Sequence, residues 1–315
     1  MKTVQEEYTF SKSEIRILRE LTRGERSLSD IEKSLLIKPS LLSYSLTKLL
    51  KKGIIRTTVK GFRKYVHFSD SKHAFLFRDL LMIYDYVDWQ NVLTGKAIEI
   101  LFQALTDSGK EFNGIPKATL WRHLRNLKAH GILSQAKDRY SINPRFLTLT
   151  NFLNEYQRFI VNTLTRTISE NAVVLWQRDF EFLVRAPKNI GSIPKNFLRT
   201  ATSLFFNMSI PIFSEFDIYF YSKKKKSIRT EDILLHTLLI ERNNVRYVIY
   251  SLLLLKKYEG KIDRGYLITE AQKYELDRQI EGMLQFLETR TPQKDLTLPT
   301  WGEFEAKARD YKVIT

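Results

Sequence analysis

Two stretches of the chain, 78 residues apart, show the same change from helix-like to strand-like spacing of apolar residues. In each stretch leucines recur at intervals of four and three, which marks one buried face of a helix. A glycine, Gly53 or Gly131, then stands where a helix C-cap is expected. The leucines are Leu42, Leu46 and Leu49 in the first stretch and Leu120, Leu124 and Leu127 in the second. The pattern predicts a duplicated structural unit.

A β-hairpin is expected directly after the first of these helices. Residues 54–59 and 62–68 alternate apolar and polar side chains around Lys60-Gly61, a pair typical of a tight turn. Apolar spacing predicts two further short helices upstream, over 13–21 and 29–36. Three helices followed by a hairpin form a winged helix-turn-helix, whose third helix is available to the major groove of DNA.

On these residues the first 69 positions resemble the MarR and ArsR classes of winged-helix regulator. Residues 94–143 also resemble a winged helix, because the run from Thr119 to Leu124 is similar to a recognition helix and a brief hairpin is expected at 134–142. The second copy departs from the pattern between its first and third helices. Leu21 to Leu42 spans 21 positions in the first copy, whereas Leu105 to Leu120 spans 15 in the second. A very short or missing middle helix is therefore expected there.

The net charge of +16 is concentrated in the two predicted winged helices. Residues 1–170 hold 28 Lys and Arg against 17 Asp and Glu, while residues 171–315 hold 23 against 18. Residues 38–69 and 112–137 contain no acidic residue. Both windows cover a third helix and its wing, where phosphate contacts would be made, so the expected partner is a polyanion, namely double-stranded DNA. A solvated basic face is the alternative interpretation.

Helical geometry identifies the side chains that point away from each leucine face. In the first copy the DNA-binding candidates are Ser40, Ser43, Tyr44, Thr47, Lys48 and Lys51 on the third helix and Arg56, Lys60, Arg63 and Lys64 in the wing. In the second copy they are Lys117, Thr119, Arg122, Arg125 and Lys128. Hydroxyl groups bond several base edges, and cations reach guanine or phosphate. Trp121 is also expected to face outward, where it either contacts DNA or packs against a neighbouring helix or partner.

The remaining chain is expected to contain two connecting helices and an α+β domain. Apolar stripes predict helices over 74–92 and 145–168, and the second stripe is either intramolecular core or a dimer seam. The C-terminal strands are predicted at 172–176, 180–185 and 215–221, and the helices at 195–207, 230–240, 244–256 and 269–288. The tail after 291 is expected to fold back and to end in a short helix. The predicted divisions are 1–70, 71–93, 94–144, 145–170 and 171–315.

Residues 172–290 resemble the C-terminal domain that accompanies winged helices in abortive-infection-type antitoxin regulators and related archaeal proteins. The resemblance rests on the run from Thr230 to His236, which is followed by an apolar run from Tyr247 to Leu255. It implies a domain for assembly, partner binding or ligand sensing, with a second copy or another protein as its partner. Abundant Lys, Ile, Leu and Phe without Cys also suits an archaeal origin.

We expect no enzymatic activity, cofactor or metal. The absence of Cys excludes disulfides, thiolate metal sites and cysteine nucleophiles. Gly191-Ser192 with Glu215 and Asp217 has residue types found in nucleotidyltransferases, but the spacing is too long for that family. His123 and His130 have no second ligand at metal spacing.

The sequence therefore predicts an α+β, sequence-specific transcriptional regulator with tandem winged helices. One alternative is a replication or plasmid-maintenance initiator that binds origin repeats. Another is an antitoxin-like or nucleotidyltransferase-like protein that acts through its C-terminal domain. The N-terminus lacks the apolar core of a signal peptide, and the longest apolar run, 248–255, is too short to span a membrane. The expected location is the cytoplasm, at the nucleoid.

Overall fold

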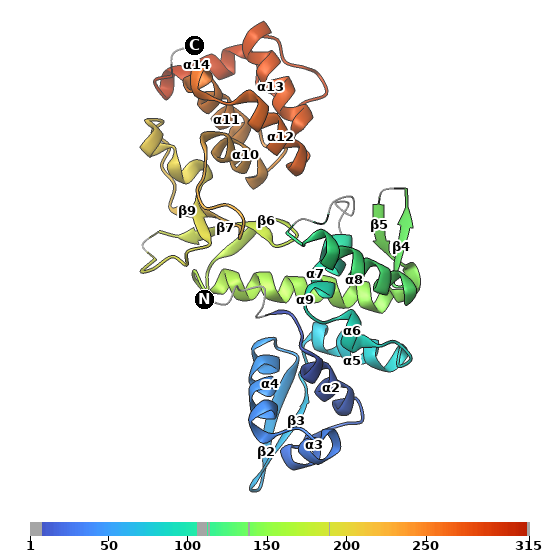
Figure 1. Cartoon of the computed structure of the whole chain (residues 1–315). Coiled ribbons are helices and arrows are strands. Elements are labelled where there is room, and N and C mark those ends of the chain that lie inside the picture. Colours follow the sequence, from blue (N-terminus) through green and yellow to red (C-terminus); the bar gives the residue numbers. More distant parts are fainter. Residues whose placement is uncertain (1–7, 106–111, 113, 138, 189, 314–315) are drawn as a thin grey trace. The chain divides into compact units, whose positions relative to one another are not determined.

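The computed structural model describes residues 8–105, 112, 114–137, 139–188 and 190–313 (Figure 1). The chain divides into two compact units, Met1–Ile160 and Val161–Thr315. Both helices and antiparallel sheets are present, so the fold class is α+β, as the sequence predicts.

The N-terminal part of the first unit has the predicted three helices and hairpin. Its elements are α2 (Lys12–Leu21), β1 (Arg26–Ser27), α3 (Leu28–Leu35), α4 (Pro39–Lys51), β2 (Ile55–Lys60) and β3 (Arg63–Phe68). Ser11 and Ser27 begin α2 and α3 by capping boxes with Glu14 and Asp30, and Pro39 occupies the first turn of α4. The short strand β1 was not predicted; it pairs with β3, which also pairs with β2.

A buried ion pair fixes α2 against the end of α4. The Lys52 ammonium donates to Glu14 Oε1 at 2.5 Å, and both side chains are almost completely buried. The other oxygen of Glu14 accepts the Ser11 backbone N–H at 2.6 Å. His73 Nε2 donates to the Lys52 carbonyl at 3.0 Å, which ties the following helix to the same point. Removing one member of such a pair would leave an uncompensated buried charge.

The predicted helix over 74–92 is broken in the structure. Helix α5 (Lys72–Ile83) ends at Tyr84, and α6 (Trp89–Val92) is a separate short helix. The Trp89 indole is fully buried and donates to the Tyr84 carbonyl at 2.9 Å, so it occupies an acceptor at the end of α5. The Arg19 guanidinium of α2 donates to the Asp85 carbonyl at 2.9 Å, so a contact with a distant helix accompanies the break in this segment.

The second copy has the predicted outer helices and wing. They are α7 (Lys96–Ala104), α8 (Lys117–Ala129), β4 (Leu133–Ala136) and β5 (Arg139–Ile142). Most of the segment where a short or missing middle helix is expected, 106–111 and 113, lies outside the described residues.

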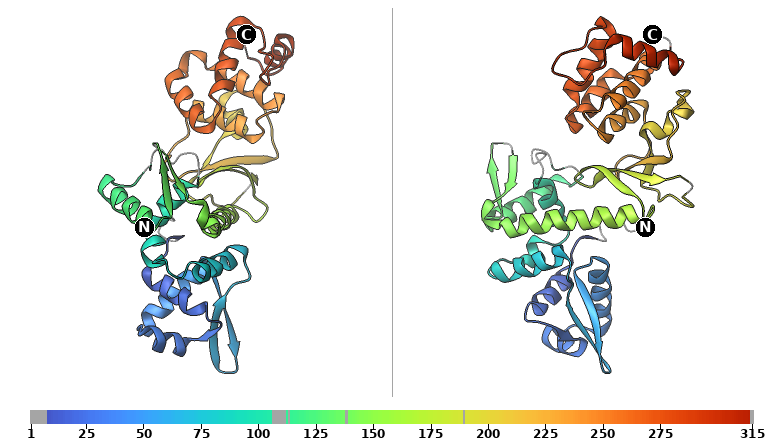
Figure 2. Two further views of the ribbon diagram at one scale, coloured as in Figure 1. Left: turned by 90° about the vertical axis from the view of Figure 1, so that its right-hand side faces the viewer. Right: turned by 180° about the vertical axis from the view of Figure 1, so that it is seen from behind.

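Helix α9 (Leu147–Arg166) begins after a turn of 3₁₀ helix, close to the predicted helix over 145–168. Its apolar stripe forms part of the core of the first unit. The Phe152 ring lies 4.6 Å from that of Phe77 in α5, and the Tyr156 ring lies 6.4 Å from that of Phe102 in α7. With 20 residues, α9 is the longest helix among the described residues, and it is the long light-green helix of Figure 2. The core interpretation of this stripe is therefore confirmed for its first half.

In its described residues, after the end of α9, the second unit combines a four-stranded antiparallel sheet with five α-helices. The sheet order is β6 (Val173–Arg178), β7 (Glu181–Pro187), β9 (Phe216–Tyr221) and β8 (Phe197–Arg199). The helices are α10 (Thr230–Ile240), α11 (Val245–Lys257), α12 (Arg264–Tyr274), α13 (Asp277–Thr289) and α14 (Trp301–Asp310). They gather at one end of the sheet (Figure 2). Leu183 and Phe220 of the sheet join one core cluster with Leu234, Leu253 and Phe286.

The helix predicted over 195–207 is wrong. Residues 197–199 form β8, which pairs with β9, and short 3₁₀ turns follow. The Phe197 ring lies 4.9 Å from the Tyr221 ring and 5.8 Å from the Phe182 ring, so cross-strand packing decides the conformation. Ala201, where the first 3₁₀ turn begins, has a positive φ of 52°, which the interior of a continuous α-helix does not accommodate.

The helix predicted over 269–288 is two helices in the structure. Asp263 begins α12 by accepting the Tyr266 N–H at 3.0 Å, earlier than predicted, and Glu275 ends it in the left-handed conformation. The tail folds back as predicted, because Phe304 is fully buried in the core cluster. Its helix is α14, which includes Trp301 and Phe304 rather than following them.

The two C-cap glycines give a matched prediction about stability. Both have positive φ, 64° at Gly53 and 66° at Gly131, but a Cβ at Gly53 would lie 2.8 Å from the Phe159 ring, whereas one at Gly131 would meet nothing within 4 Å. Gly131→Ala is expected to cost about 1 kcal/mol of unfolding free energy from backbone strain. Gly53→Ala should cost roughly 1 to 3 kcal/mol more, because the ring must move. Urea unfolding monitored by circular dichroism checks this. Equal losses of unfolding free energy in the two variants would contradict it.

Burial of His236 predicts that acid destabilises the second unit. Burial, with a smaller contribution from Lys225, lowers the pKa of this histidine to about 3. Between that pH and about 6.5 the unfolded chain binds a proton that the folded chain does not, so stability falls as pH falls. From pH 7 to 5 wild type should lose about 2 kcal/mol more than His236→Gln, whose side chain does not titrate. The unfolding free energy of each protein is measured at several pH values. An equal loss of unfolding free energy from pH 7 to 5 in the two proteins would refute this.

Candidate nucleic-acid interface

Helix α4 presents a polar face opposite its buried leucines. Leu42, Leu46 and Leu49 are buried. Of the predicted outward side chains, five are exposed and Lys48 is half-buried. The exposed ones are Ser40, Ser43, Tyr44, Thr47 and Lys51. Because one amphipathic helix orients them all, the structure brings these six residues together on one surface.

Two of these side chains are already oriented by neighbours on the same helix. The Lys48 ammonium lies 4.6 Å from the centre of the Tyr44 ring, a cation–π contact. The Thr47 hydroxyl donates to the Ser43 carbonyl at 2.9 Å, which leaves its oxygen as an acceptor. The face therefore offers hydroxyl groups at its centre and cations toward the C-terminal end of α4.

The wing carries four predicted cations, and acidic residues from outside the acid-free window neutralise two of them. Arg56 forms an ion pair with Asp70 at 2.6 Å, and Lys60 pairs with Glu25. The hydrogen bond from Lys60 is the main reason that the pKa of Glu25 lies below its usual value. Arg63 and Lys64 are exposed and form no ion pair with any described residue. Exposed pairs of this kind are weak and exchange partners at small cost.

The tip of the wing exposes an aromatic residue that was read from the sequence only as part of a strand. Lys60 and Arg63 are the last paired residues, so Gly61 and Phe62 form a two-residue turn. Gly61 has the positive φ, 62°, that such turns require at their first position. Phe62 is fully exposed. Its position directly after the turn glycine is the signal in the sequence that identifies Phe62 as a residue of the wing tip.

Helix α8 presents a second basic face. Lys117, Arg122, Arg125 and Lys128 are exposed, and Thr119 is half-buried. Trp121 is 65% exposed, so it does not pack into the core of its own unit.

The histidines of this segment have ordinary structural roles. Partial burial, with the neighbouring Arg122 charge, lowers the pKa of His123. His130 Nδ1 lies 2.9 Å from the Asn126 carbonyl one turn earlier. Across the described part of the chain, no group of three His, Cys, Asp or Glu side chains is arranged to hold a metal ion.

The carboxylates considered for nucleotidyl transfer are separated in the second unit. Asp217 of β9 accepts two hydrogen bonds from the Arg199 guanidinium, at 2.8 and 3.2 Å. Glu215 is exposed and precedes the strand, and Gly191 and Ser192 are exposed in a loop. Asp217 thus has a cation as its neighbour within the sheet.

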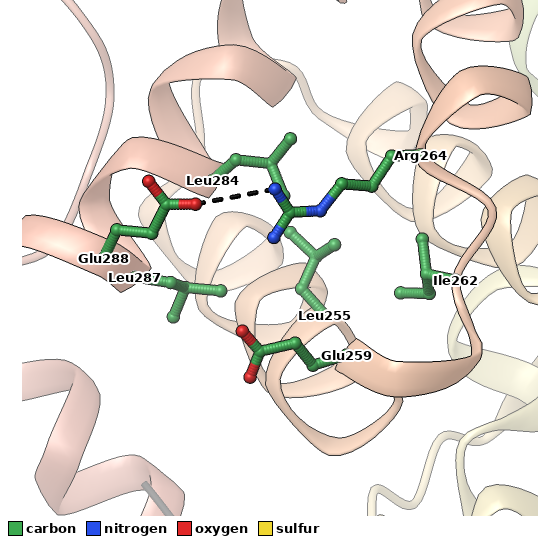
Figure 3. A pocket seen from close by; sticks show the side chains of 7 residues that line it. All are labelled: Leu255, Glu259, Ile262, Arg264, Leu284, Leu287 and Glu288. Carbon is green, nitrogen blue, oxygen red and sulfur yellow. Dashed lines mark ion pairs between the residues drawn. The ribbon is translucent and has the colours of Figure 1, made fainter.

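Two further features of the second unit have a structural explanation. A shallow pocket has an apolar floor and the Arg264–Glu288 ion pair, 3.5 Å, at its rim (Figure 3). The basic turn 223–226 contributes Lys225 to a network with Asp232 and, at 3.0 Å, Glu270. Although burial opposes the charge, Asp232, Tyr274 and Tyr266 raise the pKa of Lys225, which joins the turn to α10 and α12.

No helix in the described part of the chain is both long and apolar enough to cross a membrane.

Comparison with known proteins identifies one similarity in each unit. Residues 11–57, which run from the N-cap of α2 into β2, match the model of the bacterial regulatory protein arsR family. Residues 194–313, which run from the loop before β8 through α14, match a C-terminal domain family named HVO_2833_C. No curated protein and no solved structure matches the chain. The arsR-type match supports a DNA-binding transcription regulator.

Proposed function

We propose that this protein is a transcriptional regulator whose first winged helix reads double-stranded DNA in a sequence-specific manner. The observation that carries the proposal is the polar face of α4. It lies within the segment similar to arsR-family regulators and opposite a buried leucine stripe. A helix held in this way inserts its exposed face into the major groove.

Recognition by α4 combines close approach with hydrogen bonding. Ser40, Ser43 and Thr47 are short, so they let the helix backbone approach the base edges and bond several of them. Tyr44 bonds phosphate or packs on sugar, while Lys48 and Lys51 reach guanine or phosphate.

The wing adds contacts beside the major groove. Arg63 and Lys64 reach the flanking minor groove or its phosphates without having to leave an acidic partner. Arg56 and Lys60 contribute by exchanging Asp70 and Glu25 for phosphate oxygens.

The second segment, 94–144, acts as a further winged helix that contributes phosphate contacts. The residues that make them are Lys117, Thr119, Arg122, Arg125 and Lys128. Phosphate contacts do not distinguish one base from another. This segment therefore adds binding affinity and fixes the position of the protein on the duplex. The protein acts by binding and performs no catalysis. An initiator role, an antitoxin-like C-terminal domain that contacts a second copy or another protein, and archaeal origin stay predictions.

Removing one helix cation and one wing cation tests the proposal. Lys48→Ala with Arg63→Ala should weaken binding to DNA from upstream of the protein's own gene by about 2 to 6 kcal/mol, at about 1 to 3 per good base contact. The slope of log affinity against log salt should fall by about one unit for each of the two cations that contacts phosphate instead of a base. Fluorescence anisotropy across a salt series measures both quantities.

The matched control removes the same charge from the second unit. Lys294→Ala with Arg309→Ala takes two exposed cations from the C-terminal region and should leave affinity within about twofold. Equal affinity of the two double variants would show that α4 and its wing are not the DNA reader. Wild-type protein that does not prefer upstream over scrambled DNA would exclude an operator there.

A further inference from the structure

Helix α8 and the wing strand β5 place two cations between two rings, of which Trp121 is exposed and Tyr140 is half-buried. Trp121, Arg125 and Lys128 lie at positions i, i+4 and i+7 and therefore share one face. The Arg125 guanidinium lies 5.6 Å from the centre of the Trp121 ring. The Lys128 ammonium lies 6.0 Å from the Tyr140 ring of the wing. We call these four residues the α8 stripe.

The stripe differs from the corresponding face of α4. The residues 78 positions earlier than Trp121 and Arg125 are Ser43 and Thr47, which are short and bear hydroxyl groups. Short side chains let a helix approach base edges, whereas an upright indole in the same place holds the helix away from the floor of a groove. Duplication has therefore kept the buried leucines and replaced the groove-reading surface.

We propose that the α8 stripe binds single-stranded nucleic acid. Unpaired bases stack on Trp121 and Tyr140, and the cations between the rings contact the phosphates of the same strand. This inference goes beyond the proposed function, in which α8 supplies only phosphate contacts.

The chemistry of the stripe selects an unpaired strand. In a duplex the faces of the bases are covered by their neighbours and only the edges are accessible, so an exposed indole face finds no stacking partner. In a single strand the faces are accessible, and each is a flat π-surface that stacks on an aromatic side chain. Arg125 adds a cation–π contribution to the same base.

The charge of the α8 segment and the length of the stripe along the helix both suit single-stranded nucleic acid. Residues 112–137 contain no acidic residue, and Lys117, Arg122 and Arg125 form no ion pair within the described part of the chain. Seven residues of helix rise about 10 Å, which is roughly the length of three stacked nucleotides at about 3.4 Å each. A protein partner would be expected to meet a surface with fewer uncompensated charges at its centre.

Binding of short homopolymers to the full-length protein tests the proposal. The probes are fluorescently labelled (dT)15 and (rU)15 and a 30-base-pair duplex. Trp121→Ala should weaken (dT)15 or (rU)15 binding by about 5- to 150-fold, the range for loss of one stacking platform. Its duplex affinity should change less than about twofold. Comparison of the two homopolymers decides whether the strand is DNA or RNA.

Two further variants separate stacking from folding and from charge. Trp121→Phe keeps a ring, so it should retain most of the affinity while losing part of the tryptophan fluorescence quenching that (dT)15 causes in wild type. Lys117→Ala removes a charge from α8 without removing a ring and should weaken all three probes to a similar, smaller extent.

The proposal is overturned if wild type does not bind the homopolymers, or if Trp121→Ala weakens duplex and single strand equally. Unchanged quenching in Trp121→Phe would also overturn it, and this variant preserves the helix. The Lys48→Ala with Arg63→Ala protein distinguishes failure of this proposal from failure of the proposed function. It should lose duplex binding and keep (dT)15 binding, so that either idea can fail while the other stands.

Discussion

The buried ion pair between Glu14 and Lys52 is the interaction on which the first winged helix depends. Burying two charges costs a large free energy of desolvation, and the pair offsets it only because further hydrogen bonds complete the site. The Ser11 backbone N–H supplies one to the Glu14 carboxylate. His73 donates to the backbone carbonyl of Lys52 and so attaches the next helix beside the pair. Helix α2, the end of α4 and the start of α5 are therefore fixed at one point. The direction of the exposed face of α4 follows from that point.

The same region separates negative from positive charge. Four of its acidic residues are occupied in capping, in the core or in pairs: Asp30 caps α3, Glu14 is buried, and Glu25 and Asp70 pair with the wing. What is left on the outer surface of α4 and at the wing tip is cations and hydroxyl groups, together with the exposed Phe62 ring. A polyanion approaching this surface meets cations first, and Arg63 has no acidic partner among the described residues.

The two segments with the same leucine spacing agree in their core positions and differ in their surroundings. The leucine stripe and the C-cap glycine recur, because both are needed to end a helix and bury its face. The surroundings differ: Gly53 lies against the Phe159 ring, and Gly131 has open space. On the outside, α8 carries Trp121 where α4 carries Ser43. A core is constrained by packing on all sides, whereas an exposed face is constrained only by its partner.

The sequence by itself determined the elements whose signal is local. Apolar spacing and caps predicted α2, α3, α4, the β2–β3 hairpin and α10, and with them the outward residues of α4, because one helix orients all its side chains at a fixed angle per residue. Only the tertiary structure decided features that depend on distant residues. Residues 197–199 became a strand because β9 lies beside them. The helix after Lys72 ends at Tyr84, where Arg19 of α2 donates to the following Asp85 carbonyl. Two wing cations acquired acidic partners from outside their own window. Local spacing fixes which face of an element is apolar, but the neighbour that covers or pairs with that face is set by the folded chain as a whole.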